Sequence, residues 1–180
     1  MTRPSLRSPR LVLYPLTLDH LAATHALWTE PGVRRFLWDD EIVTAERAAH
    51  ALRASEADFE ARGFGLWGLY AAASPDLIGF CGLRLADVVP EPELLFGLSE
   101  AHWGQGLATE AARAVLAYAF DGLRLAAVGA ATDAGHVRSA HVLGRLGMRL
   151  VRRGDHHGLD TLWYRLSDAD WPRVSVRGRG

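Results

Sequence analysis

The chain contains no lysine, so all 20 of its Lys+Arg residues are Arg. The 21 acidic residues nearly balance them, and the formal net charge at pH 7 is -1. A protein that binds nucleic acid through its backbone phosphates normally carries a clear basic excess. We therefore expect no nucleic-acid partner.

Cysteine and long apolar runs are equally scarce. Cys81 is the single cysteine, which excludes an intramolecular disulfide and fits a reducing compartment. No apolar run approaches the ~18 residues of a membrane span, and a proline soon interrupts the basic N-terminal stretch, unlike in a signal peptide. We expect a cytoplasmic protein without a membrane partner.

Metal sites and nucleophile motifs are also missing. No pair among the eight histidines has the i, i+4 spacing of a helical zinc site, so we expect no metal. No Gly-x-Ser-x-Gly elbow occurs. Cys81 lies in a strand-like run and is interpreted as a core residue, and Trp38 and Trp67 fit the core as well as a substrate wall.

The length and composition of the chain suit a single domain. The 180 residues are 49% hydrophobic and 23% charged, a soluble globular composition. We expect a domain over residues 8–172 and a disordered tail over residues 173–180, which has few apolar residues.

The hydrophobic pattern predicts an α/β protein with a mixed sheet, in the order β-α-α-β-β-β-α-β-α-β-β. The first helix runs from Leu18 to Trp28, and Pro31 and Gly32 end it. The stretch 33–38 is short and mixed. The other predicted strands cover 10–16, 65–72, 77–85, 93–98, 125–131, 149–153 and 161–166, and the other helices cover 44–62, 107–123 and 137–146.

A Gly-x-Gly turn stands between the strand 93–98 and the helix after it. The first turn of a helix leaves backbone N–H groups without intrahelical partners, and the helix dipole adds partial positive charge there. Small residues at 104, 106 and 108 let a ligand approach the backbone. The turn therefore suits a phosphate or pyrophosphate, although a short glycine turn can also hold nothing.

Two common nucleotide motifs do not fit this turn. A Walker loop needs a lysine, which the chain lacks. A dinucleotide fingerprint needs Gly or Ala where Thr109 stands, and the strand 125–131 has no acidic ribose ligand until Asp133.

The region from Glu93 to Met148 resembles the GNAT superfamily of acyl-CoA-dependent N-acyltransferases. The likeness rests on Trp-Gly-x-Gly-x-Ala-Thr-Glu-Ala after a strand, followed by helix, strand, helix and Leu-Gly-Met. More narrowly, the chain is similar to the ribosomal-protein N-terminal acetyltransferase (RimJ/RimL-type) branch, with the stretches 10–17, 31–37 and 77–83 adding to the likeness. The resemblance covers about residues 8–171 and implies the GNAT fold with splayed central strands.

The resemblance also implies acetyl-CoA as cosubstrate. The backbone amides of the turn would bind the CoA pyrophosphate, which here involves Gly104, Gln105, Gly106, Leu107, Ala108 and Thr109. The strand before the turn would pair with pantetheine through Phe96, Leu98 and Ser99, and the N–H near Leu98 would polarise the thioester carbonyl.

Three residues are candidates for the chemistry of direct acetyl transfer. Glu93 matches the strand position of a general base, or it is a solvated strand-end glutamate. Ser139 matches a serine near the CoA sulfur and could donate to the leaving thiolate, or it is a helix-surface serine. His136 stands where the family usually has Asn, and it either contacts CoA, acts as acid or base, or caps the helix. The tyrosine acid of many relatives would fall at Leu143.

The sequence thus predicts an acetyl-CoA-dependent N-acetyltransferase that acts on a primary amine, either a small molecule or a protein N-terminus. A homodimer is compatible with it. The loop residues Asp39, Asp40 and Glu41, otherwise a solvated corner, and His156-His157 could face the acceptor. The alternative is a non-catalytic GNAT-like module that senses acyl-CoA or a metabolite, which the unusual His136 and Leu143 motivate.

Overall fold

A computed structural model describes residues 3–72, 74–86 and 89–172. In these described residues, eight strands form one mixed sheet in the order β1-β2-β3-β4-β5-β6-β8-β7, which confirms the predicted fold class. The tail at 173–180, predicted to be disordered, lies outside the described residues.

The strands pair antiparallel with one exception. They are β1 (Leu6–Arg7), β2 (Leu11–Pro15), β3 (Leu66–Ala71), β4 (Leu77–Arg84), β5 (Glu93–Leu98), β6 (Ala127–Asp133), β7 (Arg149–His156) and β8 (Leu159–Ser167). Among the strands of the described residues, only β5 and β6 run parallel, and a helical crossover joins them. This confirms the predicted strand–helix–strand unit.

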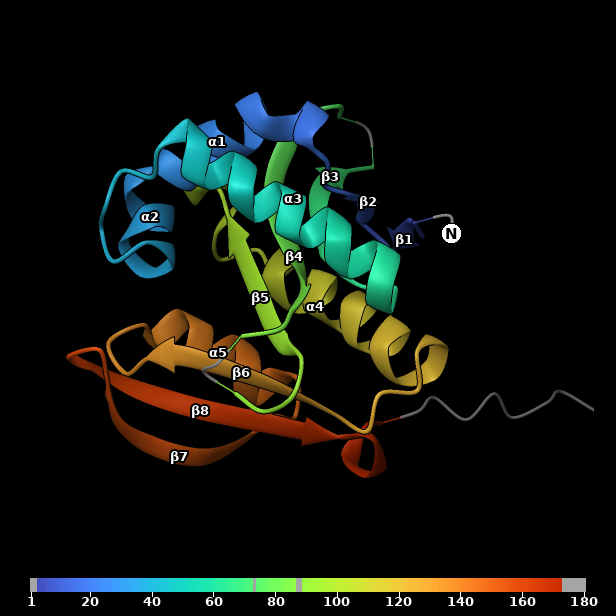
Figure 1. Cartoon of the computed structure of the whole chain (residues 1–180). Helices are drawn as coiled ribbons and strands as arrows, with labels where there is room; N and C mark the ends of the chain where they lie inside the picture. The colour runs from blue at the N-terminus through green and yellow to red at the C-terminus, as the bar shows by residue number, and fades with distance from the viewer. Residues whose placement is uncertain (1–2, 73, 87–88, 173–180) are drawn as a thin grey trace, which may run out of the picture.

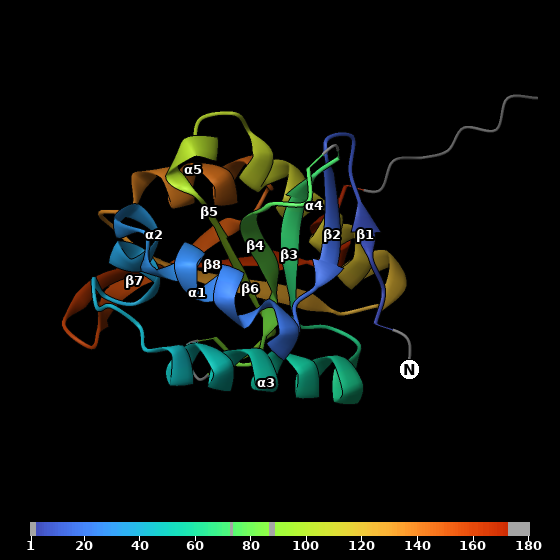
Figure 2. The same cartoon turned by 90° about the horizontal axis from the view of Figure 1, so that it is seen from above.

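Helices cover both faces of the sheet (Figures 1 and 2). One face carries α1 (Leu21–Thr29), α2 (Pro31–Leu37) and α3 (Ala45–Arg62), and the other carries α4 (Leu107–Ala117) and α5 (Val137–Arg145). Short 3-10 turns lie at Leu18–His20, Glu100–His102 and Asp168–Asp170, and a π-helical turn at Tyr118–Gly122 continues α4. The larger core cluster lies between the sheet and α4, and a smaller one lies under α1–α3.

Local sequence signals fix several boundaries as predicted. Thr44 caps α3 by accepting a hydrogen bond from the Arg47 backbone N–H, and Gly63 ends α3 in the left-handed conformation. The β7–β8 hairpin turns on two residues, His157 and Gly158, both with positive φ. That is the pattern of a type I′ turn.

Two predicted details are wrong. Pro31 does end α1, but it also starts α2, which extends to Leu37. A proline at the first helical position needs no N–H partner and already has a helical φ, so it starts a helix as readily as it stops one. A short strand, Leu6–Arg7, also precedes β2, so the described part of the chain contains one more strand and one more helix than the predicted order.

The sheet divides into two parts at the β5–β6 boundary (Figure 1). Strands β1–β5 form one part, and β6, β8 and β7 form the other. Because β5 and β6 share only the pair Glu93↔Gly129, they separate beyond that point.

Candidate functional site

The central feature of the site is the divergence of β5 and β6. We call the space between residues 94–98 of β5 and 130–133 of β6 the wedge. Its closed end is the Glu93↔Gly129 pair, where the Gly129 N–H also donates to the Pro92 carbonyl at 3.0 Å. Five steps of about 3.3 Å along the strand lead from Glu93 to Leu98, so the wedge is roughly 16 Å long on the β5 side.

The backbone of β5 turns its hydrogen-bonding groups into this wedge. The Ser99 N–H donates to the Ile78 carbonyl at 2.9 Å, so that pair bonds to β4. Antiparallel pairs alternate, and the register Gly79↔Leu98 therefore directs the N–H groups of Leu98 and Phe96 away from β4 and toward β6. Of the predicted stretch, Phe96 and Leu98 offer N–H groups to a ligand, and Ser99 does not.

On the opposite side of the wedge, β6 also directs backbone hydrogen-bonding groups into the space. The Ala134 N–H donates to the Asp160 carbonyl at 2.7 Å, beside the register Asp133↔Thr161. By the same alternation, the backbone groups of Ala131 and Asp133 face β5. Two separated strand edges thus present peptide groups to one space, and an extended ligand with amide groups can pair with them.

The Gly-x-Gly turn lies at the open end of the wedge. Gly104 and Gly106 have φ of +74° and +77°, which favours glycine, and Gly106 is the N-cap of α4. The first intrahelical bond comes from the Glu110 N–H to the Gly106 carbonyl, so the N–H groups before it have no partner within the helix. We call the backbone N–H groups of Gly104–Thr109 the cradle. The glycines are exposed, so the cradle is accessible to an anion.

Glu93 is buried at the closed end of the wedge. It is 3% exposed, and its Oε2 accepts a hydrogen bond from the Arg84 Nε at 2.7 Å. Leu94 belongs to the core under α4, whereas Leu95 packs against the cluster under α1–α3. Side chains alternate along a strand, so Glu93 lies on the Leu95 face, opposite α4.

Ser139 and Leu143 lie on one face of α5, four residues apart. They are the two buried residues of that helix, at 8% and 1% exposure. Ser139 is therefore directed inward rather than lying on the helix surface. Leu143 belongs to the core under α4 and has no group that could donate a proton.

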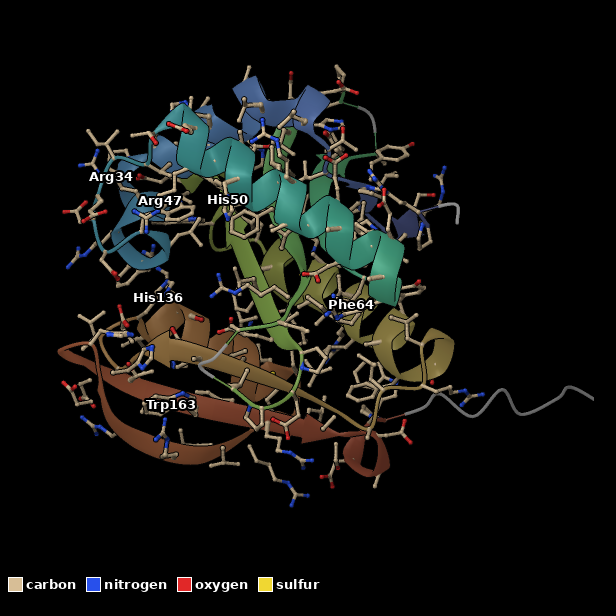
Figure 3. The ribbon with its side chains drawn as sticks, viewed as in Figure 1. Arg34, Arg47, His50, Phe64, His136 and Trp163 are labelled. Atoms are coloured by element: carbon tan, nitrogen blue, oxygen red, sulfur yellow. The ribbon has the colours of Figure 1, made fainter. Side chains whose placement is uncertain are left out.

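His136 is the N-cap residue of α5, but its side chain makes no capping hydrogen bond. Its ring stacks on Phe36 of α2, with centroids 3.7 Å apart and planes 4° apart, and Figure 3 shows it between α2 and α5. Burial, followed by the nearby charges of Arg138 and Arg35, lowers its pKa to about 4. The ring is therefore neutral near pH 7, which removes the imidazolium as a proton donor there.

This lowered pKa gives a test of the stack through stability. The unfolded chain binds a proton at His136 below about pH 6.5, whereas the folded chain does so only near pH 4. Between these values the unfolded state holds more protons, so the free energy of unfolding should fall as the pH is lowered through this window. Because the ring keeps some solvent exposure, we expect the free energy of unfolding to fall by about 1–2 kcal/mol over this window.

Denaturant unfolding at pH 7 and pH 4.5 measures that difference. His136→Gln should lose this part of the pH dependence, since Gln does not titrate. The control is His141→Gln, which changes an exposed histidine of the same helix and should retain it. Equal pH dependence in wild type and His136→Gln would contradict the assigned pKa.

The sequence did not predict two contacts at the open end of the wedge. The Arg138 guanidinium of α5 lies 4.7 Å from the Trp103 ring, whose Nε1 donates to the Leu98 carbonyl at 2.8 Å. The Gly32 N–H of α2 donates to the Glu100 carboxylate at 2.6 Å. Trp103 and Pro31 stand out in the sequence as an aromatic residue and a helix-start residue. The two residues of each contact, Arg138 with Trp103 and Gly32 with Glu100, are distant in the sequence, so local patterns do not predict the contacts.

The remaining candidates have simpler roles. Cys81 is fully buried, and burial raises the pKa of its thiol, so it is a core residue as predicted. Trp67 is also fully buried, and Trp38 packs against the smaller cluster. Burial, followed by the charge of Asp39 in the acidic loop, raises the pKa of Asp133.

The described residues lack two further features. They contain no group of three or more His, Cys, Asp or Glu side chains placed to bind a metal ion. Among the helices in the described part of the chain, none is long and apolar enough to cross a membrane.

With this geometry established, comparison with known proteins identifies the family. The pattern of the acetyltransferase (GNAT) domain matches residues 10–149. The chain belongs to the GNAT acetyltransferase family. Its activity class is therefore acetyl transfer.

Relatives of this GNAT protein agree with that class. A curated relative, the FsC-acetyl coenzyme A-N(2)-transacetylase of Aspergillus fumigatus, is 30% identical over 159 residues, covering 83% of this chain and 66% of the relative. The acetyltransferase structure from Agrobacterium tumefaciens strain C58 is 26% identical with a TM-score of 0.81, covering 92% of this chain and 95% of that one.

Ribosomal-protein acetyltransferases are also among the structural neighbours. RimL in complex with coenzyme A is 18% identical with a TM-score of 0.76, covering 93% of this chain and 100% of that one. Identity at that level shows a shared fold. The narrower RimJ/RimL-type branch therefore stays a prediction.

Proposed function

We propose that this protein is an acetyl-CoA-dependent N-acetyltransferase that transfers acetyl directly to a primary amine in the cytoplasm. The observation that carries the proposal is the wedge, whose strand edges present N–H groups, with the cradle at its open end. An elongated ligand with a doubly charged phosphate end and an amide-bearing arm complements both parts. Acetyl-CoA has that form and supplies an activated thioester.

Different residues bind the two parts of the ligand. The cradle holds the pyrophosphate, and the N–H groups of Phe96 and Leu98 pair with the arm. The Leu98 carbonyl already accepts from Trp103, so Leu98 contributes its N–H, which polarises the thioester carbonyl. The neutral ring of His136, stacked on Phe36, forms an edge of the open end.

The chemical step needs one proton removed and one thiolate stabilised. Glu93 accepts the proton that the amine nitrogen loses as it bonds to the acetyl carbon, and waters along the wedge relay this proton over the length of β5. Ser139 donates a hydrogen bond to the sulfur as the carbon–sulfur bond breaks. The two residues lie on opposite faces of the sheet, because Glu93 is directed away from α4 and Ser139 lies on the inward face of α5. The residue that acts on the acceptor amine and the residue that acts on the cosubstrate sulfur therefore lie on different faces of the sheet.

The acceptor is an amine, and both a protein N-terminus and a small-molecule amine fit the proposal. A panel of peptides with free N-termini, polyamines, aminoglycosides and amino-acid derivatives separates them. Free-thiol release from acetyl-CoA, measured for each amine, is the experiment that tests the proposed function. Turnover with peptides alone would support the RimJ/RimL-type expectation.

Ser139→Ala should lower kcat by about tenfold, since it removes one hydrogen bond to a charged leaving group. Thiol release with the best amine of the panel measures the effect. The control is Ser74→Ala in the connection between β3 and β4, where the Ser74 hydroxyl donates to Asp76. A Ser139→Ala enzyme as fast as wild type would exclude Ser139 from the step.

A second candidate is a non-catalytic module that senses acyl-CoA or a metabolite. It is favoured by Leu143, which replaces the tyrosine acid and is buried in the core, and by the ion pair of Glu93 with Arg84. The sensor would be stabilised thermally by CoA but would release no thiol with any amine of the panel.

A further inference from the structure

An arginine from the N-terminal strands reaches the cradle. Arg10 lies between β1 and β2, and its Nη1 donates to the Gln105 carbonyl at 3.0 Å. A Cβ added to Gly106 would lie 3.7 Å from the Arg10 Nη2. The guanidinium therefore lies directly against the Gly104–Gly106 turn.

Glu110 of α4 fixes Arg10 in this place. Its Oε1 accepts from the Ser8 hydroxyl at 2.7 Å and from the Arg10 backbone N–H at 2.8 Å. Its Oε2 accepts from the Arg10 Nε at 2.7 Å and pairs with the Arg10 Nη2 at the same distance. Burial alone would raise the pKa of Glu110, but these hydrogen bonds outweigh it and lower the pKa. The carboxylate thus joins the β1–β2 connection to the helix that begins at the cradle.

The contact with the Gln105 carbonyl has a consequence for the next N–H group. The peptide between Gln105 and Gly106 is planar and trans, so its carbonyl and its N–H point in opposite directions. Glycines at 104 and 106 leave that peptide free to rotate as a unit. By holding the carbonyl on its own side, Arg10 directs the Gly106 N–H to the other side, where an anion is expected.

We propose that Arg10 is a positioning residue that fixes the Gln105–Gly106 peptide in the orientation that binds the pyrophosphate of the acyl donor, an inference that rests on the proposed function. Arg10 acts through the Gly106 N–H rather than by touching the acetyl group. It should therefore affect donors that carry phosphate and leave other donors unaffected.

Arg10→Ala should raise the KM for acetyl-CoA by about tenfold, equivalent to about 1.4 kcal/mol, with kcat unchanged. S-acetylpantetheine carries the same thioester and arm without phosphates, and its kcat/KM should be the same in wild type and Arg10→Ala. A general loss of folding would lower the activity with both donors. Thiol release with one amine acceptor is measured for wild type and for Arg10→Ala, each with acetyl-CoA and with S-acetylpantetheine.

Arg10→Lys separates positioning from charge. Lysine keeps the positive charge but lacks the planar fork that bonds Glu110 and Gln105 together, so its KM for acetyl-CoA should also rise. A lysine variant with the wild-type KM would overturn the positioning role. So would a folded Arg10→Ala variant that loses activity equally with both donors.

Arg3→Ala is the matched control. Arg3 also joins the N-terminal segment to a helix, through Glu56 and Glu60 of α3, and its loss should leave both donors unaffected. If Arg10→Ala does not fold, Glu110→Gln provides the second test, since it weakens the ion pair while keeping a hydrogen-bond acceptor, and it should raise the acetyl-CoA KM selectively. A wild-type protein that neither binds CoA nor releases thiol would instead refute the proposed function itself.

Discussion

Glu93→Gln should lower kcat by about a hundredfold, because general-base catalysis typically contributes 10²- to 10⁴-fold. Glutamine has the same shape and can still accept the hydrogen bond from the Arg84 Nε, but it cannot take a proton from the amine. The KM for acetyl-CoA should be unchanged, because Glu93 lies at the closed end of the wedge, away from the cradle. Thiol release at saturating acetyl-CoA measures the effect.

Glu91→Gln is the matched control for this substitution. Glu91 lies two residues earlier and is also paired with an arginine, with 2.6 Å between its Oε1 and the Arg165 Nε. It should retain full activity. Arg84 is about half exposed at its side chain, so its charge remains solvated in Glu93→Gln and the variant should fold. A folded Glu93→Gln enzyme with wild-type kcat would remove Glu93 from the mechanism.

The elements that form the wedge could be predicted from local sequence. The strand from Glu93 to Leu98 has the predicted limits, and the Gly-x-Gly turn follows after the short 3-10 turn Glu100–His102. A strand, a crossover helix and a second strand favour parallel pairing, and the parallel pair is observed. Each of these signals involves residues adjacent in the chain, for which backbone preferences and hydrophobic spacing are sufficient.

The contacts that complete the site could not be predicted in this way. His136 stacks on Phe36, a hundred residues earlier in the chain, and Arg10 binds Glu110 across the same separation. Such pairs depend on how whole elements pack, and no periodicity in the sequence specifies them. The arginine partner of Glu93 was missed for a related reason, since it depends on the β4–β5 register Arg84↔Glu93.

The stack also changes the interpretation of His136. The sequence left three roles open, namely CoA contact, acid–base chemistry and helix capping. The absence of a side-chain capping bond argues against the third, and a pKa of about 4 argues against an imidazolium acid near neutral pH. A neutral ring that shapes the open end of the wedge is the role most consistent with the contacts.

Gly106→Val should weaken CoA binding by about a hundredfold. The φ of Gly106 is +77°, a conformation that a β-branched residue adopts only with strain. Relief of that strain would rotate the backbone and misdirect N–H groups of the cradle. Losing two hydrogen bonds to phosphate, at about 1.5 kcal/mol each, gives about 3 kcal/mol, or roughly a hundredfold in affinity. Calorimetric titration with CoA measures the change.

The control for Gly106→Val is Gly158→Val, because the two glycines carry the same strain at different places. Gly158 has a φ of +82° in the β7–β8 turn, and an added Cβ there meets nothing within 4 Å. At Gly106 the nearest atom to an added Cβ is the Arg10 Nη2 at 3.7 Å, an ordinary contact, so backbone strain dominates at both sites. Both variants should lose similar thermal stability, and only Gly106→Val should lose CoA affinity. Equal affinity in the two folded variants would mean that the cradle does not bind the pyrophosphate.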